Sequence, residues 1–479
     1  ILGQLPADVA DKLKVYDRKS ELARHTGNDD GDEDHVLDIQ VKPGFLDKWY
    51  GDIEAQYQTK KRYSGALTAS RLSDQDPHMI YAQANNANRY VDKTIGSSMN
   101  RNIDGDGKSQ YGSYNYQHNW QTKGTQQYTS NRFNISANMG HSDGWNSGKA
   151  STETFFPNQE HTFGVKDTYR YKHNLKPQLE AKLFAYTDSA NTIDVKVKAS
   201  YEKARKSYEE KSASYGYQPD QFAYHSLKEA LGAKPGDALY DRLITRDSEY
   251  ESTELQQRGL NISYIWKHFI GKKGSFMLGG YTNLSGTNED THTNHDVEYL
   301  REQRNEKLWQ FYDRSEHNLN TQFGASFEYW LGKKVYFNIF DNVRLNRSRI
   351  ARNFFSDTDE QNVVGGTPTT ADPANTTRRL THKWTNELTV KSTITPVKAL
   401  MIMPKFSWNY CREKTDYHYG PLDTTAVRTS NTYEPSIFLK WKMSRVRNMD
   451  IAFAYNTTVP DLVSTLGYRN TIDPLHIYM

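Results

Sequence analysis

Apolar and polar side chains alternate along much of the chain with a period of two. Residues 435–458, PSIFLKWKMSRVRNMDIAFAYNTT, show the pattern twice, on either side of a short polar break. The alternating apolar positions are Ile437, Leu439, Trp441 and Met443, and then Met449, Ile451, Phe453 and Tyr455. A period of two predicts β-strands with one apolar and one polar face. The pattern alone leaves open whether the apolar face meets a packed core or lipid.

Similar stretches recur through the rest of the chain, and we count about fifteen predicted strands. The apolar sets that share a face are Ile193, Val195, Val197, Ala199 and Tyr201; Leu260, Ile262, Tyr264 and Trp266; Phe323, Ala325, Phe327 and Tyr329; Val335, Phe337 and Ile339; Leu388 and Val390; and Leu400, Ile402, Phe406, Trp408 and Tyr410. Three further strands are expected near the start, in WYGDIEAQYQT, RYSGALTASRLS and HMIYAQANNA.

The predicted connections alternate between short and long. Short turns are expected near residues 74–77, 188–192, 270–273, 331–334, 395–399 and 444–448. Long polar connections are expected near 88–110, 142–167, 215–253, 286–312, 348–378 and 412–429. Long structureless loops are uncommon in compact soluble domains, whereas transmembrane barrels combine short turns on one side with long loops on the other. The alternation therefore favours a large antiparallel transmembrane β-barrel, built as one meander.

Aromatic residues stand where strands enter the short turns, at Trp266, Tyr329 and Trp441. Aromatic rings favour membrane interfaces because one end is apolar and the other can form hydrogen bonds. Each ring alone fits the core of a β-sandwich equally well. If the apolar face meets lipid, Lys440 and Lys442 face a hydrated lumen, since a charge on the lipid face costs about 2–4 kcal/mol at mid-depth.

Composition agrees with an extended β protein rather than a disordered chain. Hydrophobic residues make up 36% of the chain and aromatic residues 13%, with 33 tyrosines, whereas disordered chains are poor in aromatics. The net charge of +3, without a basic block, gives little support for a nucleic-acid partner. Cys411 is the single cysteine, so no intrachain disulfide forms. No apolar run of the length of a transmembrane helix occurs, and the first residue, Ile1, indicates a processed or trimmed chain.

Residues 1–47 differ from the rest. LPADVADKLKVYDRKSELAR has mixed helix and strand character, and an acidic turn then leads to a predicted strand at residues 36–41. We therefore expect a small α/β unit over residues 1–47, followed by a barrel over residues 48–479.

The stretches KVYDRKS and TGNDDG, with the strand that follows them, resemble the end of the plug domain of TonB-dependent-receptor-like outer membrane proteins of the Bacteroidota type. WYGDIEAQYQT, RYSGALTASRL and QANNANR, with the pair Asn85 and Asn86, are similar to the first barrel strands of that family, and residues 433–479 resemble a later barrel region. The resemblance implies a barrel of about 22 strands around an N-terminal plug. About fifteen of those strands would be present here, as an internal fragment that continues past Met479 and leaves its first and last strands as free edges.

The resemblance also implies the outer membrane of a Gram-negative bacterium and import of a ligand too large for porins. The implied partners are outer membrane lipid, an inner-membrane energising complex and a surface lipoprotein or other outer membrane proteins. Ligand contact is expected from the long loops and the plug. Two alternatives stay open: a barrel of the same family that serves structure or assembly without transport, and a soluble glycan-binding β protein.

Candidate chemistry is sparse. In NIDGDGKS, Asn102, Asp104 and Asp106 are spaced as in a calcium loop, but Ser113 stands where such a loop needs a bidentate Glu, so a solvated loop tip is favoured. The acidic NDDGDED at residues 28–34 is interpreted as a plug turn. The histidines lack the i, i+4 spacing of a helical zinc site, and no nucleotide-binding or nucleophile motif occurs. No enzyme activity and no cofactor are expected.

Overall fold

The computed structural model describes residues 10–19, 33–42, 44–86, 106–122, 131–156, 161–218, 221–332, 334–397, 399–443, 447–460 and 462. Of the residues in these ranges, 80% are in strands and 4% in helices, which confirms the predicted all-β class. No helix in these ranges is both long and apolar enough to cross a membrane.

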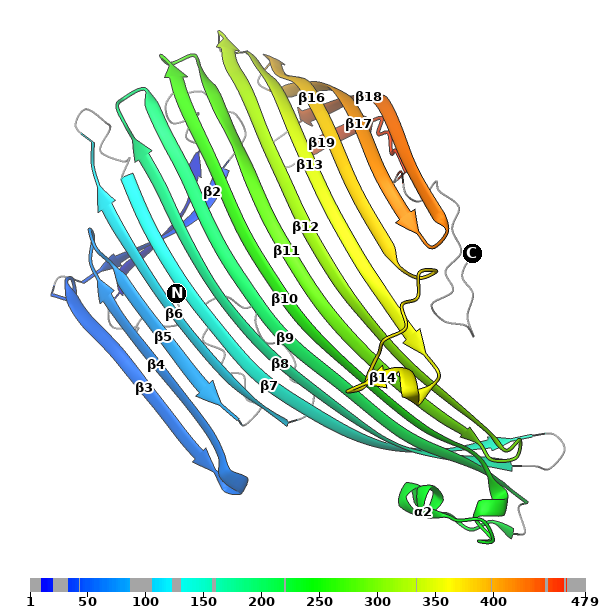
Figure 1. Ribbon diagram of the computed structural model, residues 1–479. Helices are drawn as coiled ribbons and strands as arrows, with labels where there is room; N and C mark the ends of the chain where they lie inside the picture. The colour runs from blue at the N-terminus through cyan, green and yellow to red at the C-terminus, as the bar shows by residue number, and fades with distance from the viewer. Residues whose placement is uncertain are drawn as a thin grey trace.

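Fifteen strands form one antiparallel sheet in sequence order (Figure 1). They are β3 (Lys48–Gln58), β4 (Arg62–Leu72), β5 (His78–Asn85), β6 (Asp106–Trp120), β7 (Asn131–Phe155), β8 (His161–Tyr186), β9 (Asn191–Tyr217), β10 (Leu243–Ile270), β11 (Gly274–Tyr299), β12 (Arg304–Leu331), β13 (Val335–Asp357), β16 (Thr377–Val397), β17 (Leu400–Tyr419), β18 (Leu422–Lys442) and β19 (Asn448–Ala454). A two-stranded sheet of β14 (Val363–Val364) and β15 (Thr367–Pro368) lies between β13 and β16 in sequence. The order confirms the predicted meander and the predicted number of strands.

The short turns lie where the pattern predicts them, although residues 444–446 of one turn lie outside the described ranges. Of the six predicted long connections, those at 142–167, 286–312 and 412–429 are wrong, and those at 215–253 and 348–378 are right in part. Most of the predicted connection at 88–110 lies outside the described ranges. Strands β8 to β12 are 26–28 residues long, about 90 Å at ~3.3 Å per residue. Residues 286–312 belong to β11 and β12 except for the turn at 300–303, and residues 412–429 to β17 and β18 except for 420–421. Genuine long connections occur at 218–242, which includes α2 (Leu227–Gly232), and at 358–376. Polar side chains on both faces do not end a strand whose backbone is paired by its neighbours.

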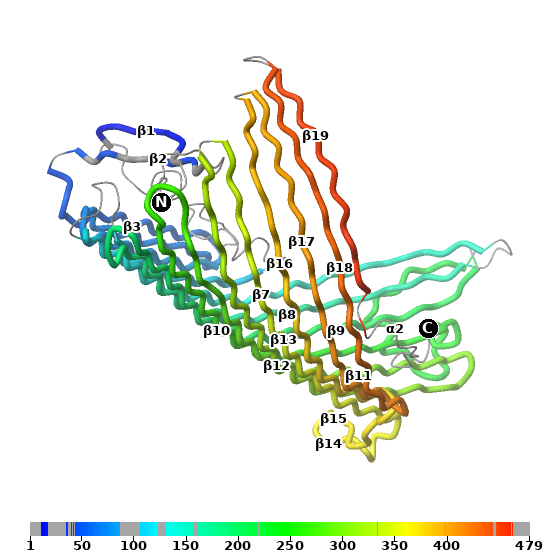
Figure 2. Tube along the Cα trace, turned by 90° about the horizontal axis from the view of Figure 1, so that it is seen from above, coloured from blue at the N-terminus to red at the C-terminus, as the bar shows by residue number. Residues whose placement is uncertain are grey.

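The sheet is curved, and Figure 2 shows its two ends lying behind its middle as drawn in Figure 1. Strands β3 and β19 are these ends, and within the described ranges each pairs with one neighbour, as expected for two free edges. On β18, residues 423–437 alternate strictly between exposed and half-buried side chains. Side chains splay apart on the convex side of a curved sheet and crowd on the concave side. The exposed set, which includes Tyr433 and Ile437, therefore lies on the convex side.

The described part of residues 1–47 is a β-hairpin rather than an α/β unit. Strand β1 (Ala10–Lys19) pairs antiparallel with β2 (Glu33–Val41), and residues 10–19 contain no helix. The alternation of Leu13 and Val15 with charged residues is the period of a strand, which corrects the expected mixed character of this stretch. The hairpin lies on the concave side of the large sheet (Figure 2).

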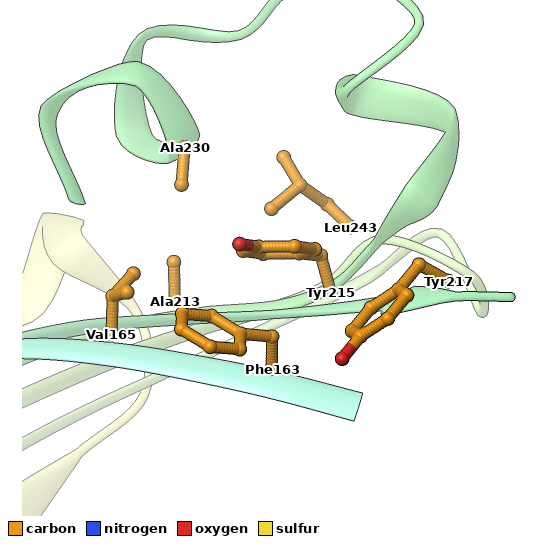
Figure 3. Packing of buried hydrophobic residues seen from close by; sticks show 7 residues of the cluster. All are labelled: Phe163, Val165, Ala213, Tyr215, Tyr217, Ala230 and Leu243. Carbon is orange, nitrogen blue, oxygen red and sulfur yellow. The ribbon is translucent and has the colours of Figure 1, made fainter. Parts of the chain in front are cut away.

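The larger of the two hydrophobic clusters formed by the described residues lies at the far end of the long strands, away from the short turns (Figures 1 and 3). Its buried residues are Phe163, Val165, Ala213, Tyr215, Tyr217, Ala230 and Leu243. Ala230 comes from α2, whose first turn is held by a capping box between Ser226 and Glu229. The backbone N–H of His225 donates a hydrogen bond of 3.1 Å to the Tyr215 hydroxyl. The helix therefore packs onto strands β8 to β10 instead of leaving their tips bare.

Candidate functional site

The strand register places one set of apolar side chains on the same face of the whole sheet. Ile135 pairs with Ala181, Ala181 with Val197, and Val197 with Ile262. Parallel rows extend this surface to both ends of the sheet. We call it the apolar band; its larger members include Trp49, Ile53, Leu67, Ile80, Tyr114, Met139, Leu179, Leu183, Ile193, Leu260, Leu284, Leu319, Phe323, Phe327, Ile339, Leu345, Leu388, Val390, Ile402, Phe406, Ile437, Leu439, Ile451 and Phe453.

The apolar band occupies only the half of each long strand next to the short turns. On the same face, Leu260 is followed away from the turn by Arg258, and Leu319 by His317. About eleven residues per strand, tilted ~45°, span about 25 Å, the height of the apolar belt of a transmembrane barrel. The band is widely exposed, since Leu345 is 51% and Phe323 49% accessible. No other layer of the described structure covers it.

Aromatic side chains border the apolar band on both sides. Trp266, Tyr329 and Trp441 lie at the short-turn edge, as predicted. Further rings at this edge are Trp49 and Trp120, and rings at the far edge are Tyr57, Trp384, Tyr410 and Tyr433. Two such girdles are typical of the two interfaces of an outer membrane barrel. The far girdle was missed in the sequence because the residues beyond it looked like loops.

One carboxylate, Asp341, is an exception within the apolar band. It pairs in register with Leu388 and Ala325, and it accepts a hydrogen bond of 2.7 Å from the Asn386 side chain. The charge is therefore partly satisfied by a neighbour on the same face.

The opposite face of the same strand halves is mainly polar, and we call it the polar face. Its exception is a hydrophobic cluster of Tyr186, Phe269, Trp330 and Tyr336 near the short turns. Glu180 forms ion pairs with Lys182 at 2.7 Å and with Lys196 at 3.2 Å. Lys440 and Lys442 also lie on this face, whereas Ile437, Leu439, Trp441, Ile451 and Phe453 share the apolar one, as the alternation predicts. A hollow of about 440 Å³ is lined largely by its side chains, among them Lys176, Gln178, Glu202, Gln257 and Asn283. Charges and open volume together suit a hydrated surface.

Beyond the apolar band both faces of the strands are mainly polar, apart from the core at the tips of β8 to β10, and we call these parts the distal halves. Glu413 is 5% exposed and pairs with Arg428 at 3.0 Å. Tyr208 donates a hydrogen bond to Glu210, which raises the pKa of Tyr208 to about 12 and lowers the pKa of Glu210. Burial, reinforced by the neighbouring carboxylates, raises the pKa of Glu249. Ion pairs and hydrogen bonds, both within and between strands, therefore stabilise the distal halves.

The predicted calcium ligands are not assembled by the described residues. Asn102 and Asp104 lie outside the described ranges. Asp106 opens β6, where its carboxylate pairs with the guanidinium of Arg62, and Ser113 lies within the same strand. Of the acidic segment 28–34, only Glu33 and Asp34 are described, at the start of β2.

A cluster of His141, Asp143 and His173 was missed in the sequence. Their potential ligand atoms all lie within 4.8 Å of one another. Helical i, i+4 spacing does not detect it, because a strand brings residues i and i+2 to one face and the facing strand supplies the third ligand. The signal was HSD at residues 141–143, and it needed the register to find His173.

No family model matches the chain, and no curated protein sequence is similar to it. Among solved structures, a mutant ferric enterobactin receptor from Pseudomonas aeruginosa matches with a TM-score of 0.17 and 10% identity over 94% of this chain and 81% of the other. The alcaligin outer membrane receptor of Bordetella pertussis gives 0.16 and 6% identity, with coverages of 94% and 80%. The FrpB iron transporter of Neisseria meningitidis gives 0.16 and 7%, with coverages of 91% and 80%. Scores of this size do not establish a shared fold, so the architecture rests on the strands and register described above.

Proposed function

We propose that the protein spans the outer membrane of a Gram-negative bacterium as a β-barrel of the TonB-dependent-receptor type. The observation that carries the proposal is the apolar band. It is continuous across fifteen strands, limited to at most about eleven residues of each, bordered by two aromatic girdles and opposed by a mainly polar face. A soluble protein rarely exposes one apolar surface of this extent. Lipid covers the band and water fills the side of the polar face.

Within this proposal the barrel, residues 48–479, imports a ligand too large for porins, and residues 1–47 belong to a plug. The hairpin β1–β2 on the concave side supports the plug assignment (Figure 2). Energy comes from an inner-membrane complex, and a surface lipoprotein or another outer membrane protein is the expected partner. The protein carries no catalytic activity and needs no cofactor.

The membrane location is tested by fractionating cells that make the full-length protein. After separation of inner and outer membranes, the protein is expected in the outer membrane. Carbonate and urea should leave it there, and only detergent should release it, because the apolar band is held by lipid. Release by carbonate without detergent would instead support the soluble glycan-binding protein.

Import is tested by comparing wild-type and gene-deleted cells for uptake of labelled oligosaccharides, peptides and metal chelates above the porin size limit. Loss of one ligand class in the deleted cells, with the same loss in wild-type cells given a protonophore, is the expected result. The distal halves favour a second candidate, a barrel that assembles with partners without transporting, because they place about 50 Å of polar strand beyond the membrane. Unchanged uptake of the whole panel, with a missing envelope protein in the deleted cells, would select that candidate.

A further inference from the structure

Three side chains that can bind a metal meet where β7 and β8 leave the apolar band. His141 and Asp143 are two residues apart on β7, so they share a face, and His173 on β8 lies directly opposite Asp143. The His173 Nδ1 atom is 2.7 Å from Asp143 Oδ1, and the His141 Nε2 atom is 3.6 Å from Asp143 Oδ2. The two imidazole rings meet edge to face, with centroids 5.1 Å apart.

The cluster is sheltered but open to solvent at one side. The side chains of His141, Asp143 and His173 are 25%, 23% and 31% exposed. Among the described residues, the buried Nδ1 atom of His141 has no hydrogen-bond partner. The Tyr171 hydroxyl donates a hydrogen bond of 3.1 Å to Asp143 and fixes the orientation of the carboxylate.

We propose that His141, Asp143 and His173 bind a divalent transition-metal ion of the Zn²⁺ class. Two imidazoles and one carboxylate with open positions suit such ions, whereas Ca²⁺ and Mg²⁺ require a shell of oxygen ligands. Tetrahedral bonds of ~2.0–2.1 Å place ligand atoms about 3.3 Å apart. The potential ligand atoms, all within 4.8 Å of one another, are close to that spacing, and solvent would complete the shell.

The ion would join two neighbouring strands at the edge of the apolar band. His141 comes directly after Met139 on this face, and His173 directly after Leu175. Lys108 pairs in register with Asp143, and Arg205 pairs in register with His173. Their positive charges disfavour binding of a cation, although Arg205 forms an ion pair with Glu254 at 3.4 Å. The proposal does not depend on the proposed function, since the ligands come together through strand pairing alone.

The alternative is a hydrogen-bonded network that binds no metal, and the chain contains a matched control for it. His295 Nε2 lies 3.0 Å from Asp247 Oδ1 on neighbouring strands β11 and β10. In the part of the chain that the structure describes, this pair belongs to no group of three ligands. The control site therefore has a histidine–aspartate pair alone, whereas the proposed site has the same kind of pair and a third ligand.

The experiment measures Zn²⁺ binding by the purified full-length protein in detergent, with metal stripped beforehand by a chelator. His141→Ala, His173→Ala and Asp143→Asn remove one ligand each, His295→Ala is the control, and circular dichroism verifies folding of each variant. Since loss of an outer-shell partner costs 10–100-fold in metal affinity, loss of a direct ligand is expected to cost at least about 100-fold. His295→Ala is expected to bind as the wild type does. Tyr171→Phe is expected to weaken binding less, while X-ray absorption of bound Zn²⁺ still shows two imidazoles.

The proposal is overturned if the wild-type protein binds no Zn²⁺. It is equally overturned if His141→Ala and His173→Ala bind as tightly as the wild type. If a ligand variant does not fold, imidazole scattering in the X-ray absorption spectrum of the wild type decides the question. Bound Zn²⁺ with fewer than two imidazoles would reject the site.

Discussion

Strand β10 has two halves with the same backbone pairing and different side chains. Near the short turn one face carries Leu260, Ile262, Tyr264 and Trp266, and beyond Leu260 the same face carries Arg258, Gln256 and Glu254. Both halves are hydrogen-bonded to β9 and β11 along their length. Backbone pairing is necessary in lipid and in water alike, so it does not distinguish the two solvents. The side chains on the convex face distinguish the two solvents, because they are apolar in one half of the strand and polar in the other.

Placing an arginine in each half of β10 is expected to give the largest difference between the two halves. Ile262→Arg puts a charge in the apolar band, which costs about 2–4 kcal/mol near mid-depth in addition to the lost apolar contact. Tyr250→Arg, on the same face of β10 in the distal half, and Ser263→Arg, on the polar face, are the controls. The measurement is the amount of folded protein in the outer membrane. Equal amounts for the three variants would contradict the assignment of the band.

A substitution in the core at the distal tip is expected to destabilise that tip without affecting the apolar band. Leu243 is 1% exposed and belongs to the same cluster as Ala230 of α2 (Figure 3), so Leu243→Ala should cost about 2–5 kcal/mol locally. Hydrogen exchange should accelerate in residues 221–246 and stay unchanged in residues 260–270. Acceleration throughout β10 would show that the two halves unfold as one unit.

A buried ion pair of the distal half is expected to matter more than an exposed one. Arg428→Ala leaves Glu413 buried without its partner, which costs about 1–3 kcal/mol. Lys149 and Asp167 form a pair at 3.0 Å in which the lysine is largely exposed, so Lys149→Ala should change stability by less than about 0.5 kcal/mol. Denaturant titration of the detergent-solubilised protein measures both. A larger effect for Lys149→Ala would reverse the expected ranking.

The smallest effect concerns pH. Burial raises the pKa of Glu249, so the folded state binds a proton more readily than the unfolded state, and stability rises as pH falls through the raised pKa towards the ordinary value. Glu249→Gln should remove this contribution. Hydrogen exchange in residues 246–252 at pH 7 and pH 5 tests it, as the difference between wild type and variant. The same pH response in both proteins would show that other groups, such as His295, cause it.

The apolar band could be predicted from the sequence because its two faces differ. Ile193, Leu260 and Phe323 stand in alternating stretches, and the short turns beside them were located correctly. Most of the distal halves could not be predicted, because stretches that are polar on both faces have no period to detect. The two-residue turn at Gly420 and Pro421, where Gly420 has a φ of +55°, was a local signal that the polar stretch around it was a hairpin.

The metal cluster depends on register rather than on spacing along the chain. His141 and His173 are 32 positions apart in the printed numbering, and only the pairing of Asp143 with His173 brings them together. A one-residue shift of β8 against β7 would move His173 to the opposite face. Cross-strand sites of this kind require the sheet before they can be recognised.

The most direct test of the account measures which solvent each side chain of β10 meets. Spin labels are attached to single cysteines at positions 246 to 268, in a protein carrying Cys411→Ser and reconstituted in lipid. Collision rates with oxygen, which is enriched in lipid, and with a water-soluble nickel complex are then compared. The account predicts opposite period-two alternation of the two rates from 260 to 266, with oxygen favoured at 260, 262, 264 and 266, and high nickel accessibility at all exposed positions from 246 to 258. Uniform nickel accessibility along the whole strand would contradict a membrane-spanning apolar band.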